Sequence, residues 1–225
     1  MADTTSTQRL SIWQLILVPA VITLAVTILR LVGELQHLSK VWFNPEAGGP
    51  WSVIGITWLP PIFGIYFAVK LVTAGKGPTS VWRALGWALL GVVVAVAGVW
   101  LEQRLRPQLS FQQELIYIWF NWSLAAAVTY PAWPALFKTM LAYGYAARIP
   151  VAIVMFFAFL GNWGTHYDAL PPNFPATGVW PKFLWLGFFP QLTFWVGFTI
   201  LAGMLFGAIA AVLMGLRRRA PEPVP

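Results

Sequence analysis

The sequence predicts an all-α membrane protein, a bundle of about six transmembrane helices in a single polytopic domain covering residues 1–225. Its composition is the first observation: 59% of the residues are hydrophobic, only 9% are charged, and the mean hydropathy is +0.71. A soluble domain carries about 25% charged residues, so too little charge remains here to cover a surface that faces water. The second observation is that the apolar residues form long runs, near the ~20 residues that a helix needs to cross the hydrocarbon. The expected helices cover residues 12–32, 51–72, 81–101, 114–133, 144–163 and 190–216.

The first span could be mistaken for a signal peptide, and the second span contains a pair of prolines. The run from Ile12 is longer than the ~7–15 apolar residues of a signal peptide, so it predicts a membrane helix that is retained. In the second span Pro60-Pro61 falls near the middle, where two missing backbone donors interrupt a helix. One interpretation is a plain kink. The alternative is a broken helix lining the cavity of a small transporter or permease.

The later spans are bounded by polar or ambiguous segments. A polar stretch separates the third span from the fourth, which begins at Glu114. Residues 134–147 mix Lys138, Tyr143 and Tyr145 with apolar residues, and we expect an interfacial segment there; the alternative assigns them to the fourth and fifth helices. The last apolar run is too long for one straight span, so we expect a second interfacial segment over residues 181–190, divided from the sixth helix at Pro190.

The distribution of lysine and arginine predicts the orientation. Nine of these residues fall on the side of the N-terminus, Arg148 and Arg217-Arg218-Arg219 among them, and five fall on the opposite side. Positive charge is retained in the cytoplasm. We therefore expect an integral protein of a bacterial inner (plasma) membrane with both termini cytoplasmic, and we call the opposite side the outer side.

Small residues recur every four positions along the sixth span, which predicts close helix packing. Internal packing within the bundle is the favoured interpretation, and a seam for a homo-oligomer or a partner subunit is the alternative. The stripe consists of Thr199, Gly203, Gly207, Ala211 and Gly215.

Candidate site residues concentrate on the outer side. Arg30, Glu34 and His37 are spaced i, i+4, i+7, so they share one face if the first helix extends that far. The plainer interpretation is a local Arg30–Glu34 pair that neutralises itself near the headgroups. The alternative is a site in which Arg30 stabilises the ionised form of Glu34 and binds an anionic group. On the fourth span Glu114 and Asn121 share a face as well and are candidate ligand-binding residues.

The loop after the fifth span adds further polar groups. Trp163, His166, Tyr167 and Asp168 lie within a few residues of one another, in a long proline-rich connection of a kind that is often functional. We consider His37, His166, Glu34 and Asp168 candidate catalytic residues for acid–base chemistry. Trp163 and Tyr167 join Arg30 as candidate ligand-binding residues. The plainer interpretation of the loop is a hydrophilic cap without chemistry.

Several function classes are unsupported. The chain has no cysteine, which excludes thiolate catalysis and cysteine-ligated metals. Glu34-x-x-His37 forms half of a di-metal carboxylate motif whose second half is missing, so no metal site is predicted, and no particular cofactor is indicated. The net charge of +7 is explained by the ends of membrane helices rather than by nucleic-acid binding.

Tryptophan is unusually frequent, at 14 of 225 residues, and enriched on the outer side. An aromatic belt explains most of these residues. The excess on one side predicts a tryptophan-rich outer face that binds membrane lipid, another amphiphilic small molecule or a partner subunit. The alternatives are the transporter with a cavity at Pro60-Pro61, and a membrane-embedded enzyme that acts on a lipid-like substrate with His37 or His166 and Glu34 or Asp168. The outer-side tryptophans are Trp42, Trp51, Trp100, Trp119, Trp122, Trp163, Trp180 and Trp185.

Overall fold

Long α-helices dominate the computed structural model, which describes residues 11–47, 52–172, 174–175 and 178–217. The all-helical expectation is confirmed, and the described ranges contain no strand. The six long helices are α1 (Ile12–Leu35), α2 (Leu59–Thr73), α3 (Val81–Leu105), α4 (Phe111–Val128), α5 (Pro134–Gly161) and α8 (Phe194–Arg217). Short helical segments connect them: η1 (Ile56–Trp58), η2 (Arg106–Gln108), η3 (Tyr130–Ala132), α6 (Val179–Lys182), the π-helix η4 (Phe183–Phe188) and α7 (Phe189–Leu192).

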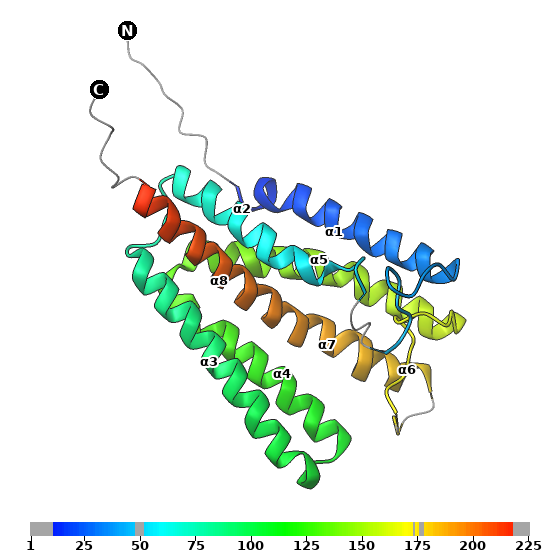
Figure 1. Ribbon diagram of the computed structural model, residues 1–225. Helices are drawn as coiled ribbons and strands as arrows, with labels where there is room; N and C mark the ends of the chain where they lie inside the picture. Colours follow the sequence, from blue (N-terminus) through cyan, green and yellow to red (C-terminus); the bar gives the residue numbers. More distant parts are fainter. Residues whose placement is uncertain (1–10, 48–51, 173, 176–177, 218–225) are drawn as a thin grey trace, which may run out of the picture.

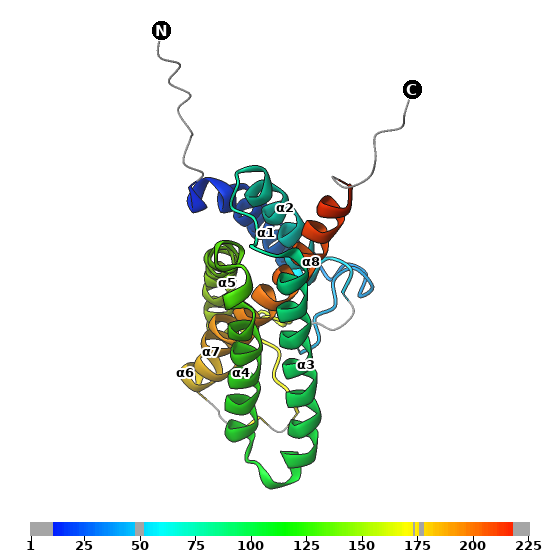
Figure 2. The same cartoon turned by 90° about the vertical axis from the view of Figure 1, so that its left-hand side faces the viewer.

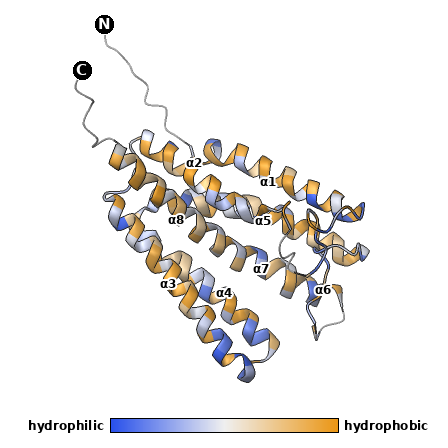
Figure 3. Cartoon of the chain, in the orientation of Figure 1, coloured by the Kyte–Doolittle hydropathy of each residue, from blue (hydrophilic) through white to orange (hydrophobic). Residues whose placement is uncertain are grey.

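Five helical segments of the described residues are long and apolar enough to cross a membrane. They contain α1, α2, α3, α5 and the run from α6 to α8. Figure 3 shows apolar residues along these helices and hydrophilic residues gathered at the turn between α3 and α4. Helix α4 is 18 residues long and carries Gln112, Gln113, Glu114 and Asn121, and of the six long helices it is the one outside these five segments.

The helices run back and forth between the two ends of the bundle (Figure 1). The start of α1 and the end of α8 lie at the same end, together with the α2–α3 and α4–α5 connections. The α1–α2 loop and the loop after α5 lie at the other end. Helix α8 is central, since it packs against α2, α3, α4 and α5. Figure 2 shows α3 and α4 as a hairpin that projects from the rest of the bundle.

The small-residue stripe on α8 is filled within the chain. A Cβ atom on Gly64 of α2 would lie 2.4 Å from the Gly203 carbonyl oxygen, and a Cβ on Gly203 would meet Met140 of α5. The two backbones of α2 and α8 therefore approach so closely that only glycine fits. Ala211 is buried as well, which agrees with the favoured prediction of internal packing.

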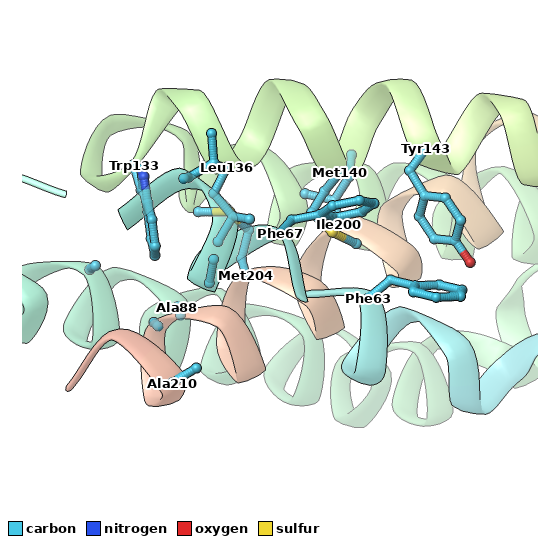
Figure 4. Close-up of a cluster of buried hydrophobic side chains, with 14 of the residues drawn as sticks. Phe63, Phe67, Ala88, Trp133, Leu136, Met140, Tyr143, Ile200, Met204 and Ala210 are labelled. Carbon is cyan, nitrogen blue, oxygen red and sulfur yellow. The ribbon is translucent and has the colours of Figure 1, made fainter. Parts of the chain in front are cut away.

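The main core lies at the contact of α2, α5 and α8 (Figure 4). Phe63 and Phe67 of α2 pack edge-on against Tyr143 of α5, with ring centroids 5.3 and 5.7 Å apart. Met140 and Met204 fill the space beside them. Because Tyr143 also exchanges a 2.8 Å hydrogen bond with Thr23 of α1, this core attaches the first helix to the fifth.

The prediction of a break in mid-helix at Pro60-Pro61 is wrong. Helix α2 begins at Leu59, so both prolines occupy its first turn. The first amide groups of a helix have no partner within the helix, and proline is favoured there because it lacks the amide hydrogen. Residues 52–55, expected to be helical, precede the helix, and Trp51 lies outside the described residues.

The interfacial segment expected over residues 134–147 is also wrong. These residues form the first half of the continuous helix α5, in which Leu136, Met140, Tyr143 and Ala147 are buried. Pro134 begins the helix, and Pro150 is accommodated inside it. Membrane helices tolerate such an internal proline because neighbouring groups satisfy the freed carbonyl.

The division of the last apolar run is observed, although it falls slightly later than Pro190. The run is interrupted by the six-residue π-helix η4 and by Thr193, which separates α7 from α8. Pro190 lies in the first turn of α7. The short helices therefore place a cluster of aromatic residues at the end of the bundle where the functional candidates gather.

Candidate functional site

A cavity of about 400 Å³ lies between α1, α4, α5, the loop after α5 and the segment from η4 to α8. Its polar lining residues include Arg30, Arg148, His166, Tyr167 and Gln191. Aromatic residues form much of the remaining wall: Trp119, Trp185, Phe194 and Trp195. A concave, largely apolar pocket with a few convergent polar groups is the usual form of a small-molecule site.

Glu34 is the centre of a buried ionic cluster at the edge of this cavity. Its side chain is inaccessible to solvent, and its Oε1 accepts a 2.8 Å hydrogen bond from Nε of Arg30. The backbone N–H of His166 donates to Oε2 at 2.8 Å, and His166 Nδ1 lies 2.6 Å from Oε1. The structure thus brings together Arg30, Glu34 and His166, although His166 lies far from the other two in the sequence.

The loop after α5 has a local geometry that places His166 against Glu34. Asn162 ends α5 in the left-handed conformation at φ 47°, which asparagine tolerates better than most residues. The Asp168 carboxylate accepts hydrogen bonds from the backbone N–H groups of Gly164 and Thr165 and from the Thr165 hydroxyl. Asp168 therefore fixes the shape of the loop.

Burial lowers the pKa of His166 below its usual value. The Glu34 carboxylate opposes this shift, but Glu34 is already paired with Arg30. A proton on His166 would add a second positive charge to a buried pair that is neutral. At neutral pH His166 is consequently uncharged, and with Nδ1–H donating to Glu34 its Nε2 is a hydrogen-bond acceptor.

Tyr167 forms the neighbouring part of the wall. Its hydroxyl donates a 3.1 Å hydrogen bond to the Thr27 carbonyl oxygen of α1. The side chain is buried, and burial raises the pKa of the phenol above its usual value. Tyr167 is thus a neutral group that closes one side of the cavity and ties the loop to α1.

Arg148 is the most unusual polar residue of the cavity. It lies near the middle of α5, only 3% of its surface is exposed, and its Nε has no hydrogen-bond partner among the described residues. One guanidinium nitrogen lies 3.5 Å from Gln191 Oε1, and the guanidinium carbon lies 4.6 Å from the centre of the Trp195 ring. Burying a charge with so few partners is costly, so the position marks a functional candidate.

Aromatic side chains from two parts of the chain close the cavity toward the α3–α4 hairpin. Trp119 of α4 stacks on Trp185 of η4 with ring centroids 5.5 Å apart and an interplanar angle of 28°. Phe189 of α7 lies 5.5 Å from the same Trp119 ring. These contacts bridge the hairpin and the η4–α7 segment.

No protein-family model, curated protein or solved structure matches this chain. The cavity and its residues are therefore the basis for a functional proposal.

Several of the sequence candidates lie apart from this cluster. His37 follows the end of α1, has a positive φ of 51° and is exposed, so it does not share a face with Arg30 and Glu34. Glu114 pairs with Arg106 at 2.9 Å at the turn of the hairpin. Asn121 donates to the Ala95 carbonyl oxygen at 3.1 Å and so joins α4 to α3.

Trp163 and Asp168 belong to the loop but do not line the cavity. Trp163 packs against the smaller hydrophobic cluster of α5. Of the described residues, no three histidine, aspartate or glutamate side chains gather in a way that would hold a metal ion.

Arg148, Gln191 and Trp195 line the cavity but were not among the site residues predicted from the sequence. Arg148 was assigned to the basic inner boundary because residues 134–147 were expected to lie at the interface. An arginine in the middle of a long apolar run, two residues before Pro150, was the available signal. Because α5 is continuous from Pro134 to Gly161, Arg148 lies near the middle of the helix and is buried.

Proposed function

We propose that this chain is an integral membrane protein that binds an amphiphilic ligand in the cavity between α1, α4, α5 and η4–α8. The proposal depends on one observation: aromatic side chains and buried polar side chains line the same cavity of about 400 Å³. The polar lining residues offer hydrogen bonds to a headgroup, and the indole and phenyl rings suit the apolar part of the ligand.

The proposed location is a bacterial inner membrane with both termini in the cytoplasm. Arg148 and Arg30 are removed from the count because their side chains are buried within the bundle. Eight cations then remain on the proposed inner side and four on the outer side. This bias supports the orientation by the retention of positive charge. The cavity then lies beneath the outer end of the bundle.

Native mass spectrometry of the detergent-purified protein tests the binding proposal. Ala169 lines the cavity, so Ala169→Trp fills part of the space that a ligand would occupy. We expect the wild type to retain a lipid-sized adduct that Ala169→Trp loses. Ala127→Trp places the same side chain on an exposed position of α4 outside the cavity and should keep the adduct. Equal adducts in all three proteins, or none in the wild type, would contradict the proposal.

A second candidate function follows from the His166–Glu34 contact. A neutral histidine oriented by a carboxylate at Nδ1 presents Nε2 as a general base, and this histidine lines the cavity. The chain would then be a membrane-embedded enzyme acting on a lipid-like substrate. Incubation with a membrane lipid extract should in that case yield products by mass spectrometry. His166→Gln should abolish these products while the adduct persists.

A further inference from the structure

The charge balance of the cavity favours one class of amphiphile. Arg30 and Glu34 form a neutral pair at 2.8 Å, and burial keeps His166 uncharged beside them. Arg148 is the remaining charged residue of the lining, and no carboxylate among the described residues lies within 4.0 Å of it. The cavity therefore carries a net positive charge.

A buried guanidinium of this kind needs an anion. Its cation–π contact with Trp195 and its long contact with Gln191 leave Nε without a hydrogen-bond partner among the described residues. A buried charge without an opposite charge is strongly unfavourable, and charged residues inside membrane bundles pair with one another or line a binding path. Arg148 is about 20 Å from Gly161 along α5, at a rise of about 1.5 Å per residue, so its charge lies far from the end of the helix.

The donors around Arg148 match an oxyanion. Arginine presents its N–H groups in a planar fork that fits carboxylate and phosphate oxygens in pairs. Gln191 adds an amide N–H₂ group whose contact within the chain is with the weakly accepting sulfur of Met155 at 3.4 Å. Both side chains line the cavity, so an anionic headgroup there would receive hydrogen bonds from α5 and from α7.

The apolar part of the ligand has a place as well. Val151 and Met155 continue along α5 from Arg148, and Trp119 and Trp185 form the wall toward the hairpin. A ligand with its anionic end on Arg148 would lay its hydrocarbon against these side chains.

We propose that the ligand is an amphiphile with an oxyanion headgroup, a carboxylate or a phosphate monoester, and that Arg148 with Gln191 binds this headgroup. The inference rests on the proposed binding function and adds the charge of the ligand to it. It predicts a preference for the anionic form that depends on Arg148, whereas the binding function alone predicts no such preference.

Quenching of tryptophan fluorescence by brominated amphiphiles tests this inference, because Trp119, Trp185 and Trp195 line the cavity. Three probes share one dibrominated alkyl chain and differ only in the headgroup: a carboxylate, its uncharged methyl ester and a phosphate monoester. The signal is the saturable quenching that an excess of the unbrominated compound reverses. Comparison of the carboxylate with the phosphate monoester tells which of the two headgroups the site prefers.

In the wild type we expect at least one anionic probe to bind about tenfold or more tightly than the methyl ester. Arg148→Met should reduce this ratio to about one without weakening the binding of the ester. Arg148→Lys keeps a charge in the same wall and should retain the preference with reduced affinity, because lysine lacks the planar fork. Arg104 also lies over a tryptophan ring, at 5.2 Å from that of Trp100, but is exposed on α3, so Arg104→Met is the matched control and should behave as the wild type.

Thermal stability separates a ligand-binding role from a structural one. If Arg148 serves an anion, Arg148→Met should be at least as stable as the wild type without ligand, because it removes an uncompensated buried charge. The anionic probe should then stabilise the wild type and leave the variant unchanged.

Two results would overturn the inference in different ways. Equal binding of the ester and both anionic probes to the wild type, or an anion preference that survives in Arg148→Met, overturns the assignment of charge while the proposed function stands. Absence of saturable quenching by all three probes overturns the assignment together with the proposed function.

Discussion

His166 shows how a single contact across the sequence determines the state of a residue. Its ring meets a carboxylate that Arg30 has already neutralised, so a proton on the ring would create excess positive charge in a buried place. The folded protein consequently disfavours a proton that the unfolded chain accepts at the ordinary histidine pKa of about 6.5. The group therefore links folding stability to pH.

The thermal stability of the protein should fall as the pH is lowered from about 7.5 to about 5.5. The sign follows from the depressed pKa of His166: in this window the unfolded state binds a proton that the folded state does not, so stability is present above the unfolded pKa and lost below it. We expect a decrease in Tm on the order of a few degrees, measured in one detergent at several pH values.

His166→Asn should remove most of this pH dependence. His37→Asn is the matched control, since His37 is exposed and its positive φ is one that asparagine tolerates. The control should keep the slope of the wild type. A slope that is the same in wild type and in His166→Asn would show that another group causes it.

The sequence contained part of this site at the residue level. The i, i+4 spacing of Arg30 and Glu34 is local, and it led to the pair that the structure shows at 2.8 Å. His166 was a candidate for its chemistry, but its partner depends on how the loop after α5 folds back on α1. The roles of these residues in ligand binding or catalysis stay predictions.

At the scale of the elements, the contact of α2 with α8 depends on two glycines. A Cβ atom on Gly64 would lie 2.4 Å from the carbonyl oxygen and 2.5 Å from the Cα of Gly203, and both atoms belong to backbone that cannot rotate away. Gly64→Ala should therefore separate the two helices and destabilise the protein by about 1–3 kcal/mol, the usual cost of overpacking. The decrease should be measurable as a lower Tm in detergent.

Gly86→Ala provides the control for this substitution. Gly86 lies on α3, and an added Cβ there would have no neighbour within 4 Å. Its Tm should equal or exceed that of the wild type, because alanine is the better helix former. If Gly64→Ala were as stable as Gly86→Ala, the close approach of α2 and α8 would be contradicted.

Two expectations at this scale failed because they depended on contacts with other helices. Pro60-Pro61 was placed near the middle of a span, where prolines interrupt a helix, and residues 134–147 were expected to lie at the interface because they mix polar and apolar side chains. Yet Pro60-Pro61 begins α2, and Pro150 lies inside an unbroken α5. Whether a proline starts, interrupts or joins a helix depends on the hydrogen-bond partners around it, and those partners come from other helices. The small-residue stripe was predicted correctly because its spacing is a property of α8 alone.

For the whole molecule, the bundle has the hydrophobicity of a membrane protein and two ends of different character. The start of α1 and the end of α8 lie at the same end as the α2–α3 connection, whereas the α3–α4 turn and the loop after α5 lie away from that end (Figures 1 and 2). The hydropathy pattern predicted this alternation because each span simply reverses the direction of the chain. The sequence predicted a binding face with Trp119 and Trp185 at this end, but not the shape of the cavity that they line, since that shape needs the lateral arrangement of five separate segments.

The topology can be tested directly because the chain has no cysteine. Thr79→Cys in the α2–α3 connection, and Gln108→Cys and Pro172→Cys at the opposite end, each place one thiol at an exposed position. In intact cells a membrane-impermeant maleimide should label Gln108→Cys and Pro172→Cys, whereas Thr79→Cys should react only after the membrane is opened. Labelling of Thr79→Cys alone would contradict the proposed orientation. The side of the bundle with more lysine and arginine would then face the outside, against the retention of positive charge in the cytoplasm. Labelling of all three positions in intact cells would be incompatible with a bundle that spans the bilayer, and the cavity would then face water rather than the outer half of a membrane.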